Sequence, residues 1–318
     1  MAVYTAVSGA DLERFLAAYD LGAPLSFKGI AEGVENSNYF LETEAGRFIL
    51  TLYEKRANPD DLPYFLDLMA HLAAHGLPAP PPIPDRTGRM LQSLAGRPAC
   101  LISFLTGTEA ATITPDHTRA VGAALAHMHR ATADFPRQRA NDLSLAGWQA
   151  LWAEIDPVAA ESVHAGLGGR IEAELAHLAT AWPARLPTGT IHADLFPDNV
   201  LFTGTTVTGL IDFYFACTDF LAYDLAVCLN AWCINDAGTL DPALQDGLIA
   251  GYESVRALDG KEKAHLPLLA RGAALRFLLT RLYDWLNPVE GAMVRAKDPR
   301  PYLHRLTTLQ ALDGQPHG

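Results

Sequence analysis

The sequence lacks the features that would place this protein in a membrane, outside the cell or on a nucleic acid. No apolar stretch reaches about 18 residues without a charge, so no membrane-spanning helix is expected. Residues 1–5 do not form the basic segment that opens a secretory signal. The formal net charge is −12, whereas nucleic acids and anionic membranes attract basic surfaces. We therefore expect no nucleic-acid partner, no membrane partner and a cytoplasmic location.

Cysteine is also scarce, and internal repeats and low-complexity tracts are absent. The four cysteines are Cys100, Cys217, Cys228 and Cys233, and their spacing fits neither a metal site nor a disulfide framework. We interpret them as small core residues in a reducing compartment. The hydrophobic share of 49% against a charged share of 19% is typical of a folded globular protein and argues against a disordered chain.

The first third of the chain is rich in strand-like segments. A helix of about three turns, capped by Ser8, precedes them. A longer helix begins at Pro59 and ends before Gly76. Alternating apolar residues predict strands over 24–32, 37–43, 47–53 and 100–105.

From Thr114 onward the pattern becomes helical. Before it, residues 103–108 form a connector. We therefore expect an α+β protein with two lobes: a small antiparallel-sheet lobe over residues 1–106 and a larger, mostly helical lobe over residues 107–318.

The most informative segment reads Ile-His-Ala-Asp-Leu-Phe-Pro-Asp-Asn over residues 191–199 and is followed by Ile-Asp-Phe over 211–213. This is the His-x-Asp-x-x-x-x-Asn pattern, a short hairpin and a second Asp, which together are typical of phosphotransferases built on the protein-kinase plan. A polar loop between two ordinary strands is the alternative interpretation. The combined pattern favours a kinase and predicts a protein-kinase-like two-lobe fold.

Phosphoryl transfer needs in-line placement and charge neutralisation, which assigns a role to each of these residues. Asp194 is predicted to take the proton of an attacking hydroxyl. Asn199 and Asp212 are predicted to hold Mg²⁺ on the triphosphate of ATP. His192 is expected to pack and hydrogen-bond under the loop. Asp224 is expected either to accept backbone N–H bonds from the loop or only to cap its own helix.

The nucleotide is expected to contact the first lobe. The turn over 29–39 is rich in Gly and Asn and can cover a triphosphate, since glycine lets the backbone approach closely and the polar side chains offer donors. The end of the last strand is expected to offer backbone groups to adenine. The predicted nucleotide contacts are Gly33, Asn36, Ser37, Asn38, Thr51, Ser103 and Leu105.

Over almost its whole length, the chain resembles the aminoglycoside-phosphotransferase-like kinases, and within them the subgroup that acts on homoserine. The broad resemblance lies in residues 192–194, 197–201, 211–213 and 223–226. The narrower one lies in residues 29–39, 50–54, 61–69 and 212–217. The resemblance implies ATP-dependent phosphorylation of the side-chain hydroxyl of L-homoserine, which yields a precursor of threonine.

One departure from the general kinase pattern concerns the phosphate-binding cation. The third strand of a kinase carries a lysine at the position that Thr51 occupies here. Either Mg²⁺ and loop donors hold the phosphates, or Lys55 or Arg47 reaches in, or activity is lost. The homoserine-kinase subgroup that the chain resembles also has threonine at this position, which favours an active enzyme.

Homoserine carries an amine and a carboxylate, and each needs a partner. Arg276, in an apolar helix, is the predicted carboxylate contact, with Arg271 and Arg281 as further candidates. Asp219, or the aromatic face of Tyr214 or Trp232, is predicted to face the amine. Another small alcohol (an aminoglycoside, choline or a sugar) remains an alternative substrate, and a nucleotide-binding pseudokinase remains an alternative class. We expect a monomer or a homodimer.

Overall fold

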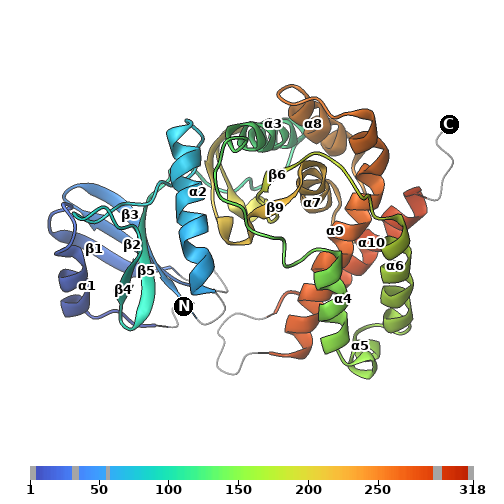
Figure 1. Cartoon of the computed structure of the whole chain (residues 1–318), viewed down its shortest axis with the longest axis horizontal. Helices are drawn as coiled ribbons and strands as arrows, with labels where there is room; N and C mark the ends of the chain where they lie inside the picture. Colours follow the sequence, from blue (N-terminus) through green and yellow to red (C-terminus); the bar gives the residue numbers. More distant parts are fainter. Residues whose placement is uncertain (1–4, 31–35, 55–57, 289–295, 314–318) are drawn as a thin grey trace. The chain divides into compact units, whose positions relative to one another are not determined.

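The chain folds into two compact units (Figure 1). The computed structural model describes residues 5–30, 36–54, 58–288 and 296–313. Unit 1 comprises Met1–Thr106, Gly209–Ile211 and Gly291–Arg295, and unit 2 comprises Gly107–Thr208, Asp212–Glu290 and Ala296–Gly318.

Unit 1 is built on a five-stranded antiparallel sheet with the order β1-β2-β3-β5-β4. The strands are β1 (Pro24–Gly29), β2 (Asn36–Thr43), β3 (Gly46–Tyr53), β4 (Gln92–Leu94) and β5 (Arg97–Ser103). The strands predicted from alternation are confirmed with shifted ends. The last one begins at Arg97 and stops at Ser103, so Phe104 and Leu105 lie beyond the sheet.

Two helices flank this sheet, one on each side (Figure 1). α1 (Gly9–Leu16) packs on the face that carries Phe48, Leu50 and Leu52, because side chains alternate along β3. Ser8 caps α1 as predicted, with its hydroxyl accepting from the backbone N–H of Asp11 at 3.1 Å. The prediction of about three turns was too long: the helix ends at Leu16, and Tyr19 reaches the same core from the turn that follows.

The second helix follows β3. The helix predicted to begin at Pro59 starts as a 3₁₀ turn, η1 (Pro59–Asp61), which the Asn58 side chain caps, and continues as α2 (Leu62–Ala74). The buried residues of α2 include Leu62, Phe65, Leu66, Met69 and Leu72, which form the apolar stripe predicted by their helical spacing.

Unit 2 is mostly helical, with two small sheets. Its helices are α3 (Pro115–Ala131), α4 (Leu145–Glu154), α5 (Pro157–Val163), α6 (Leu167–Ala181), α7 (Leu221–Cys233), α8 (Pro242–Glu253), α9 (Gly260–Leu286) and α10 (Arg300–Asp313). β6 (Thr188–Ile191) pairs with β9 (Cys217–Phe220), and β7 (Val200–Thr203) forms the predicted hairpin with β8 (Thr206–Leu210). The 3₁₀ turns η2 (Pro197–Asn199) and η3 (Phe213–Phe215) flank the hairpin.

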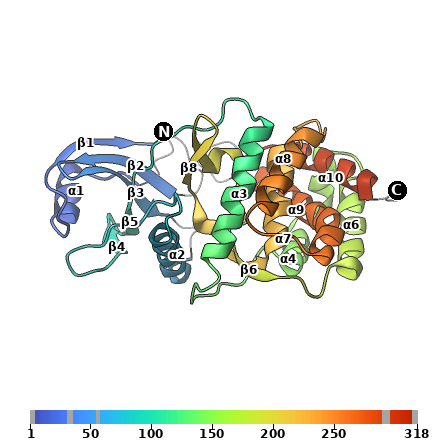
Figure 2. The same ribbon diagram turned by 90° about the horizontal axis from the view of Figure 1, so that it is seen from above.

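The core of unit 2 is organised around α7. Every residue of α7 except Ala231 is buried, and α9 packs along it (Figure 2). Such complete burial explains why α7 is apolar nearly all round rather than on one stripe. Asn230, a polar residue of this helix, donates through Nδ2 to the carbonyl oxygens of Ala226 at 3.0 Å and Ala270 at 2.9 Å, while its Oδ1 has no hydrogen-bond partner among the described residues.

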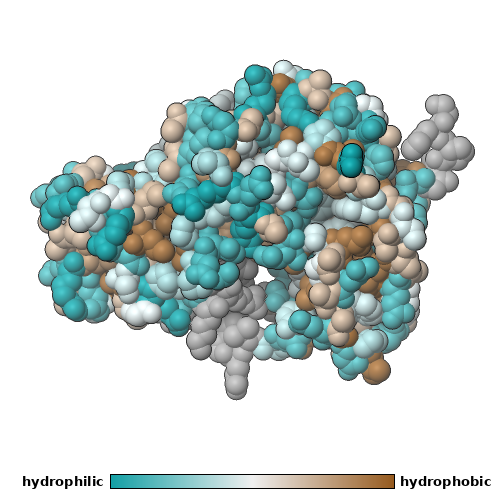
Figure 3. Space-filling view, viewed as in Figure 1, coloured by the Kyte–Doolittle hydropathy of each residue, from teal (hydrophilic) through white to brown (hydrophobic). Residues whose placement is uncertain are grey.

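The surface of the described part is largely polar. Figure 3 shows mixed polar residues over the visible face, with apolar residues in separate small groups. Only Leu25, Phe104, Val158 and Leu312 are exposed large hydrophobic side chains among the described residues. Within those same ranges, every helix is too short or too polar to span a bilayer.

α3 and α8 lie side by side (Figure 2) and cross closely through glycines. A Cβ on Gly122 would overlap the carbonyl oxygen of Leu248, and one on Gly251 would overlap that of Arg119. The obstacles are backbone atoms, which cannot rotate away as a side chain can. Glycine therefore sets the distance between these two helices.

We expect Gly122→Ala to lower the free energy of unfolding by about 1–3 kcal/mol, since the two helices must separate to admit the methyl group. Gly169→Ala in α6 is the control, because its Cβ would point into open space. There we expect a gain of about 0.5–1 kcal/mol from helix propensity. Urea unfolding measures both, and equal effects of the two changes would contradict the account.

Candidate active site

The predicted catalytic loop connects β6 to β7. It contains Ala193 at φ 63°, and the hairpin that follows ends at Asp212 at φ 64°. Non-glycine residues enter this left-handed region at a cost of about 1–3 kcal/mol each. Both positions adjoin residues predicted to act on substrate or metal, so the surrounding contacts must hold a strained backbone in place.

Asp224 supplies the main support for the loop. Its carboxylate accepts the backbone N–H groups of His192 at 2.7 Å and Ala193 at 2.8 Å. The helix-cap alternative was wrong, because α7 begins at Leu221 and Asp224 points out of its first turn toward the loop. Burial raises the pKa of Asp224, but the hydrogen bonds it accepts outweigh that effect and hold the pKa below its usual range.

His192 lies under the loop, as predicted. Its side chain is fully buried, and its ring contacts that of Phe213 with centroids 4.8 Å apart. The backbone N–H of Asp194 donates to His192 Nδ1 at 3.3 Å. His192 therefore supports the backbone conformation of the segment that carries Asp194.

Two residues predicted to bind substrate instead contact the backbone of the loop. Arg276 Nη1 donates to the carbonyl oxygen of Ala193, and Trp232 Nε1 donates to that of Leu195 at 2.8 Å. Each is only 2% exposed. The Arg276 guanidinium also lies over the ring of Phe277, 4.4 Å from its centroid. These contacts assign both side chains to the positioning of the loop.

A chain of hydrogen bonds continues from Asp224 to the far side of unit 2. His129 on α3 lies with Nε2 3.1 Å from Asp224 Oδ2 and Nδ1 2.8 Å from the hydroxyl of Tyr252 on α8. Arg256 Nη1 donates to the Tyr252 hydroxyl at 3.1 Å and to Glu262 Oε1 at 2.9 Å. We call Arg256, Tyr252, His129 and Asp224 the buried relay.

Arg256, the last residue of the buried relay, determines which group donates in each of its hydrogen bonds. Because Arg256 can only donate, Tyr252 accepts from it and gives its own proton to His129 Nδ1. Nε2 of His129 is then the protonated nitrogen, and it donates to Asp224. The sequence alone did not identify Tyr252 and Arg256, since no motif marks them.

Asp194 lies at the centre of an acidic group. It is partly exposed, and Asn199 Nδ2 donates to its Oδ2 at 3.2 Å and to its carbonyl oxygen at 2.8 Å. Burial raises the pKa of Asp194 to about 8; the charge of Arg276 opposes this rise, whereas the charges of Asp212 and Asp198 add to it. The predicted partners Asp194, Asn199 and Asp212 thus lie near one another.

This arrangement fits a hard divalent cation. Like-charged carboxylates repel until a cation joins them, and oxygen is the ligand atom that Mg²⁺ prefers. Asn199 directs its nitrogen at Asp194, so its oxygen is the atom available to a metal. Asp212 contributes a carboxylate, and Tyr214 follows it in η3 as a partly exposed side chain.

The predicted nucleotide contacts in unit 1 fall on two faces of β2. Thr51 is paired with Asn38, and its hydroxyl donates to Asn38 Oδ1 at 2.8 Å. Asn38 and Asn36 share that face, and Asn36 Oδ1 is buried with no hydrogen-bond partner among the described residues. Ser37 points the other way, because side chains alternate along a strand. Its hydroxyl donates to Glu54 Oε1 at 2.7 Å.

The other predicted nucleotide contacts and candidate phosphate-binding cations of unit 1 have different surroundings. The backbone N–H of Ser103 donates to the carbonyl oxygen of Pro81 at 3.0 Å. The N–H of Leu105 makes no backbone hydrogen bond within the described part of the chain, which suits a donor to adenine. Arg47 is paired with Glu42 at 3.1 Å. Gly33 and Lys55 lie outside the described residues.

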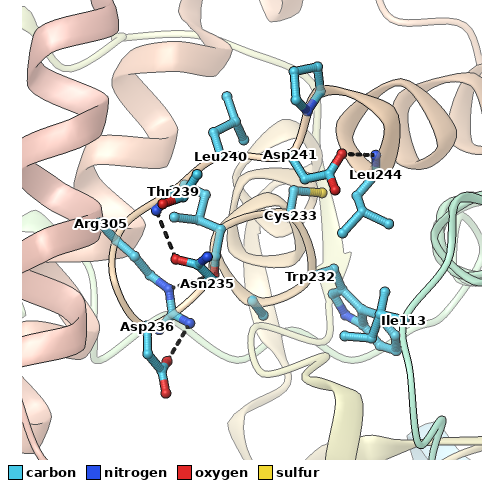
Figure 4. Close-up of a pocket in the computed structure, with 13 residues that line it drawn as sticks. Ile113, Trp232, Cys233, Asn235, Asp236, Thr239, Leu240, Asp241, Leu244 and Arg305 are labelled. Atoms are coloured by element: carbon cyan, nitrogen blue, oxygen red, sulfur yellow. Dashed lines mark hydrogen bonds and ion pairs between the residues drawn. The ribbon is translucent and has the colours of Figure 1, made fainter.

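A hollow of about 670 Å³ opens beside the end of α7 (Figure 4). Trp232 lines it and connects it to the catalytic loop. Its polar side chains are engaged by their own surroundings: Asp236 pairs with Arg305 at 3.0 Å, and Asp241 accepts from the first backbone N–H groups of α8. These contacts shape the loop between α7 and α8.

Comparison with known proteins agrees with this geometry. The model of the phosphotransferase enzyme family matches residues 26–258. A homoserine kinase of Xanthobacter autotrophicus is 56% identical over 313 residues, 98% of this chain and 97% of that protein. A homoserine kinase of Allorhizobium ampelinum is 57% identical over 313 residues, with the same coverage of 98% and 97%.

Solved structures show the same fold. A spectinomycin phosphotransferase in complex with ADP and spectinomycin matches with a TM-score of 0.71 at 15% identity, covering 96% of this chain and 98% of that one. The fold is therefore the aminoglycoside-phosphotransferase and protein-kinase-like fold predicted from the sequence. Because the family model covers most of the chain and these relatives are more than half identical over nearly all of it, the chain belongs to the phosphotransferase enzyme family.

Proposed function

We propose that this protein transfers the terminal phosphoryl group of ATP, bound with Mg²⁺, to the side-chain hydroxyl of L-homoserine. The product is O-phospho-L-homoserine, and the reaction takes place in the cytoplasm. The observation that carries the reaction type is the group of Asp194, Asn199 and Asp212 on one supported loop and hairpin. The relatives named homoserine kinase support the choice of acceptor.

The lobes divide the work in this proposal. Residues 1–106 form the nucleotide-binding lobe, in which Asn38, oriented by Thr51, offers its amide N–H groups to the phosphates. Residues 107–318 form the catalytic and substrate-binding lobe. Thr51 is 1% exposed and uncharged, so it acts through Asn38 rather than as a substitute for lysine.

Asp194 acts on the acceptor. Its carboxylate orients the hydroxyl of homoserine for in-line attack and receives its proton. Bound Mg²⁺, held by Asn199 and Asp212, neutralises charge on the phosphates. Asp224 and His192 keep the loop backbone in the conformation that presents Asp194, and Arg276 and Trp232 fix the carbonyl side of the same loop.

The acceptor is tested by measuring ADP release with L-homoserine, L-serine, L-threonine, choline and kanamycin side by side. We expect the highest kcat/KM with L-homoserine and a phosphomonoester product by ³¹P NMR. Faster turnover of choline or kanamycin would replace the proposed substrate. ATP binding without turnover of any acceptor would indicate a pseudokinase.

We expect Asp194→Asn to lower kcat by roughly 10²- to 10⁴-fold, because the amide cannot receive the proton. Binding of ATP, measured by calorimetry, and the unfolding temperature should stay close to those of the wild type. A variant that turns over at the wild-type rate would remove Asp194 from the mechanism.

Tyr252→Phe tests the buried relay. The change leaves His129 Nδ1 without its donor, and we expect kcat to fall roughly three- to tenfold while KM for both substrates is unchanged. The ¹⁵N spectrum of His129 should show a mixture of tautomers. Tyr19→Phe is the control, because the buried hydroxyl of Tyr19 has no hydrogen-bond partner within the described part of the chain. If Tyr252→Phe lowers only the unfolding temperature, the relay is structural and does not position the loop.

A further inference from the structure

The acceptor of the proposed reaction carries a carboxylate, and four arginines of unit 2 lie near the loop or its supporting helices. Arg271 binds Glu174 through two bonds of 2.8 and 2.7 Å and also pairs with Asp313. Arg276 donates to the loop carbonyl of Ala193. The acidic partners of Arg271 occupy its guanidinium. Arg276 Nε has no hydrogen-bond partner among the described residues, but the side chain is only 2% exposed, which keeps a substrate carboxylate away from it.

Arg305 is also engaged. It donates to the carbonyl of Ile234 at 3.0 Å and pairs with Asp236 at 3.0 Å. Like Arg276, Arg281 forms no salt bridge within the described ranges, and its one hydrogen bond there goes to the carbonyl of Asp298 at 3.4 Å. Unlike Arg276, it is partly exposed, so a small molecule can reach it. The Asp298 carboxylate is bound by Arg300 instead.

The position of Arg281 is fixed by an aromatic ring. Its guanidinium lies 4.5 Å from the centroid of Tyr302, and Arg305 lies 4.6 Å from the same ring. Tyr302 is fully buried, so the ring is a rigid support. Stacking on an aromatic face orients the plane of a guanidinium and leaves its edge N–H groups pointing outward.

This aromatic support reaches the catalytic loop. Tyr302 contacts Phe277 with centroids 5.1 Å apart, and Phe277 contacts Phe196 at 4.8 Å. Phe196 is two residues after Asp194. Phe277 and Arg281 are one turn apart on α9 and therefore share a face of that helix. Arg281 thus lies on the side of α9 that faces the segment carrying Asp194.

The electrostatics favour an anion at this point. Arg281 and Arg305 place two positive charges around one ring, and the carboxylate that pairs with Arg305, that of Asp236, is 81% exposed. Burial lowers the pKa of Arg281 and the charge of Arg305 adds to that effect, while the charges of Asp236 and Asp194 oppose it without cancelling it. A carboxylate beside Arg281 would relieve this repulsion.

We propose that Arg281 binds the α-carboxylate of the acceptor, so that the enzyme selects hydroxylated amino acids over amino alcohols. This inference rests on the proposed function and adds the residue that sets acceptor class. A planar guanidinium donates two parallel hydrogen bonds to a carboxylate, which fixes the orientation of the acceptor as well as its charge.

The test compares L-homoserine with 3-amino-1-propanol, which retains the hydroxyl and amine but lacks the carboxylate. In Arg281→Met we expect kcat/KM for L-homoserine to fall about 100-fold, mainly through KM. The kcat/KM for 3-amino-1-propanol and the KM for ATP should stay within about twofold of the wild-type values. Arg281→Lys keeps the positive charge and the aliphatic part of the side chain but not the two parallel N–H donors of the guanidinium. Its kcat/KM for L-homoserine should therefore fall by an intermediate amount.

Arg130→Met is the matched control. Arg130 is an exposed arginine of unit 2 that also donates to a backbone carbonyl, that of Val255 at 3.3 Å. We expect it to leave both acceptors unaffected. Equal losses for the two acceptors in Arg281→Met, or no loss for L-homoserine, would overturn the inference alone. A wild-type enzyme that does not phosphorylate L-homoserine would overturn the proposed function and this inference with it.

Discussion

The structure depends on one buried carboxylate that holds a strained loop. Asp224 accepts the backbone N–H groups of two successive loop residues, and one of these, Ala193, has a left-handed conformation that alanine rarely adopts. Without those bonds, the loop would relax toward an ordinary backbone conformation and Asp194 would move. The side chains that act on substrate are thus placed by a residue that does not touch it.

The surrounding helices keep the Asp224 carboxylate buried and hydrogen-bonded. α7 is buried almost all round, so Asp224 is shielded from water and keeps its partners. The close crossing of α3 and α8, set by glycines, brings His129 and Tyr252 into hydrogen-bond distance. Because Arg256 can only donate, it decides which group donates in each hydrogen bond from Tyr252 to Asp224. The packing of α3 and α8 is thus connected to the geometry of the catalytic loop by a continuous series of hydrogen bonds.

Much of this was predictable from the sequence, for identifiable reasons. Local patterns specified the strands of unit 1 and the hairpin after Asn199, because alternation and turn chemistry act over a few residues. The helix predicted from Pro59 begins as a 3₁₀ turn, and α2 itself starts at Leu62. The spacing of Asp194, Asn199 and Asp212 specified the chemistry. Local patterns could not reveal the buried relay, whose bonds join residues 95 and 123 positions apart. They also could not tell that Ser37 would bind Glu54, or that Arg276 would bind the loop.

A structure of the protein with Mg²⁺, a non-hydrolysable ATP analogue and L-homoserine tests the central claim most directly. We expect the acceptor hydroxyl within about 3 Å of an Asp194 oxygen, the metal on Asn199 and Asp212, and the loop backbone still bound to Asp224. A hydroxyl placed beside a different base, or a loop that leaves Asp224 when the substrates bind, would contradict this account.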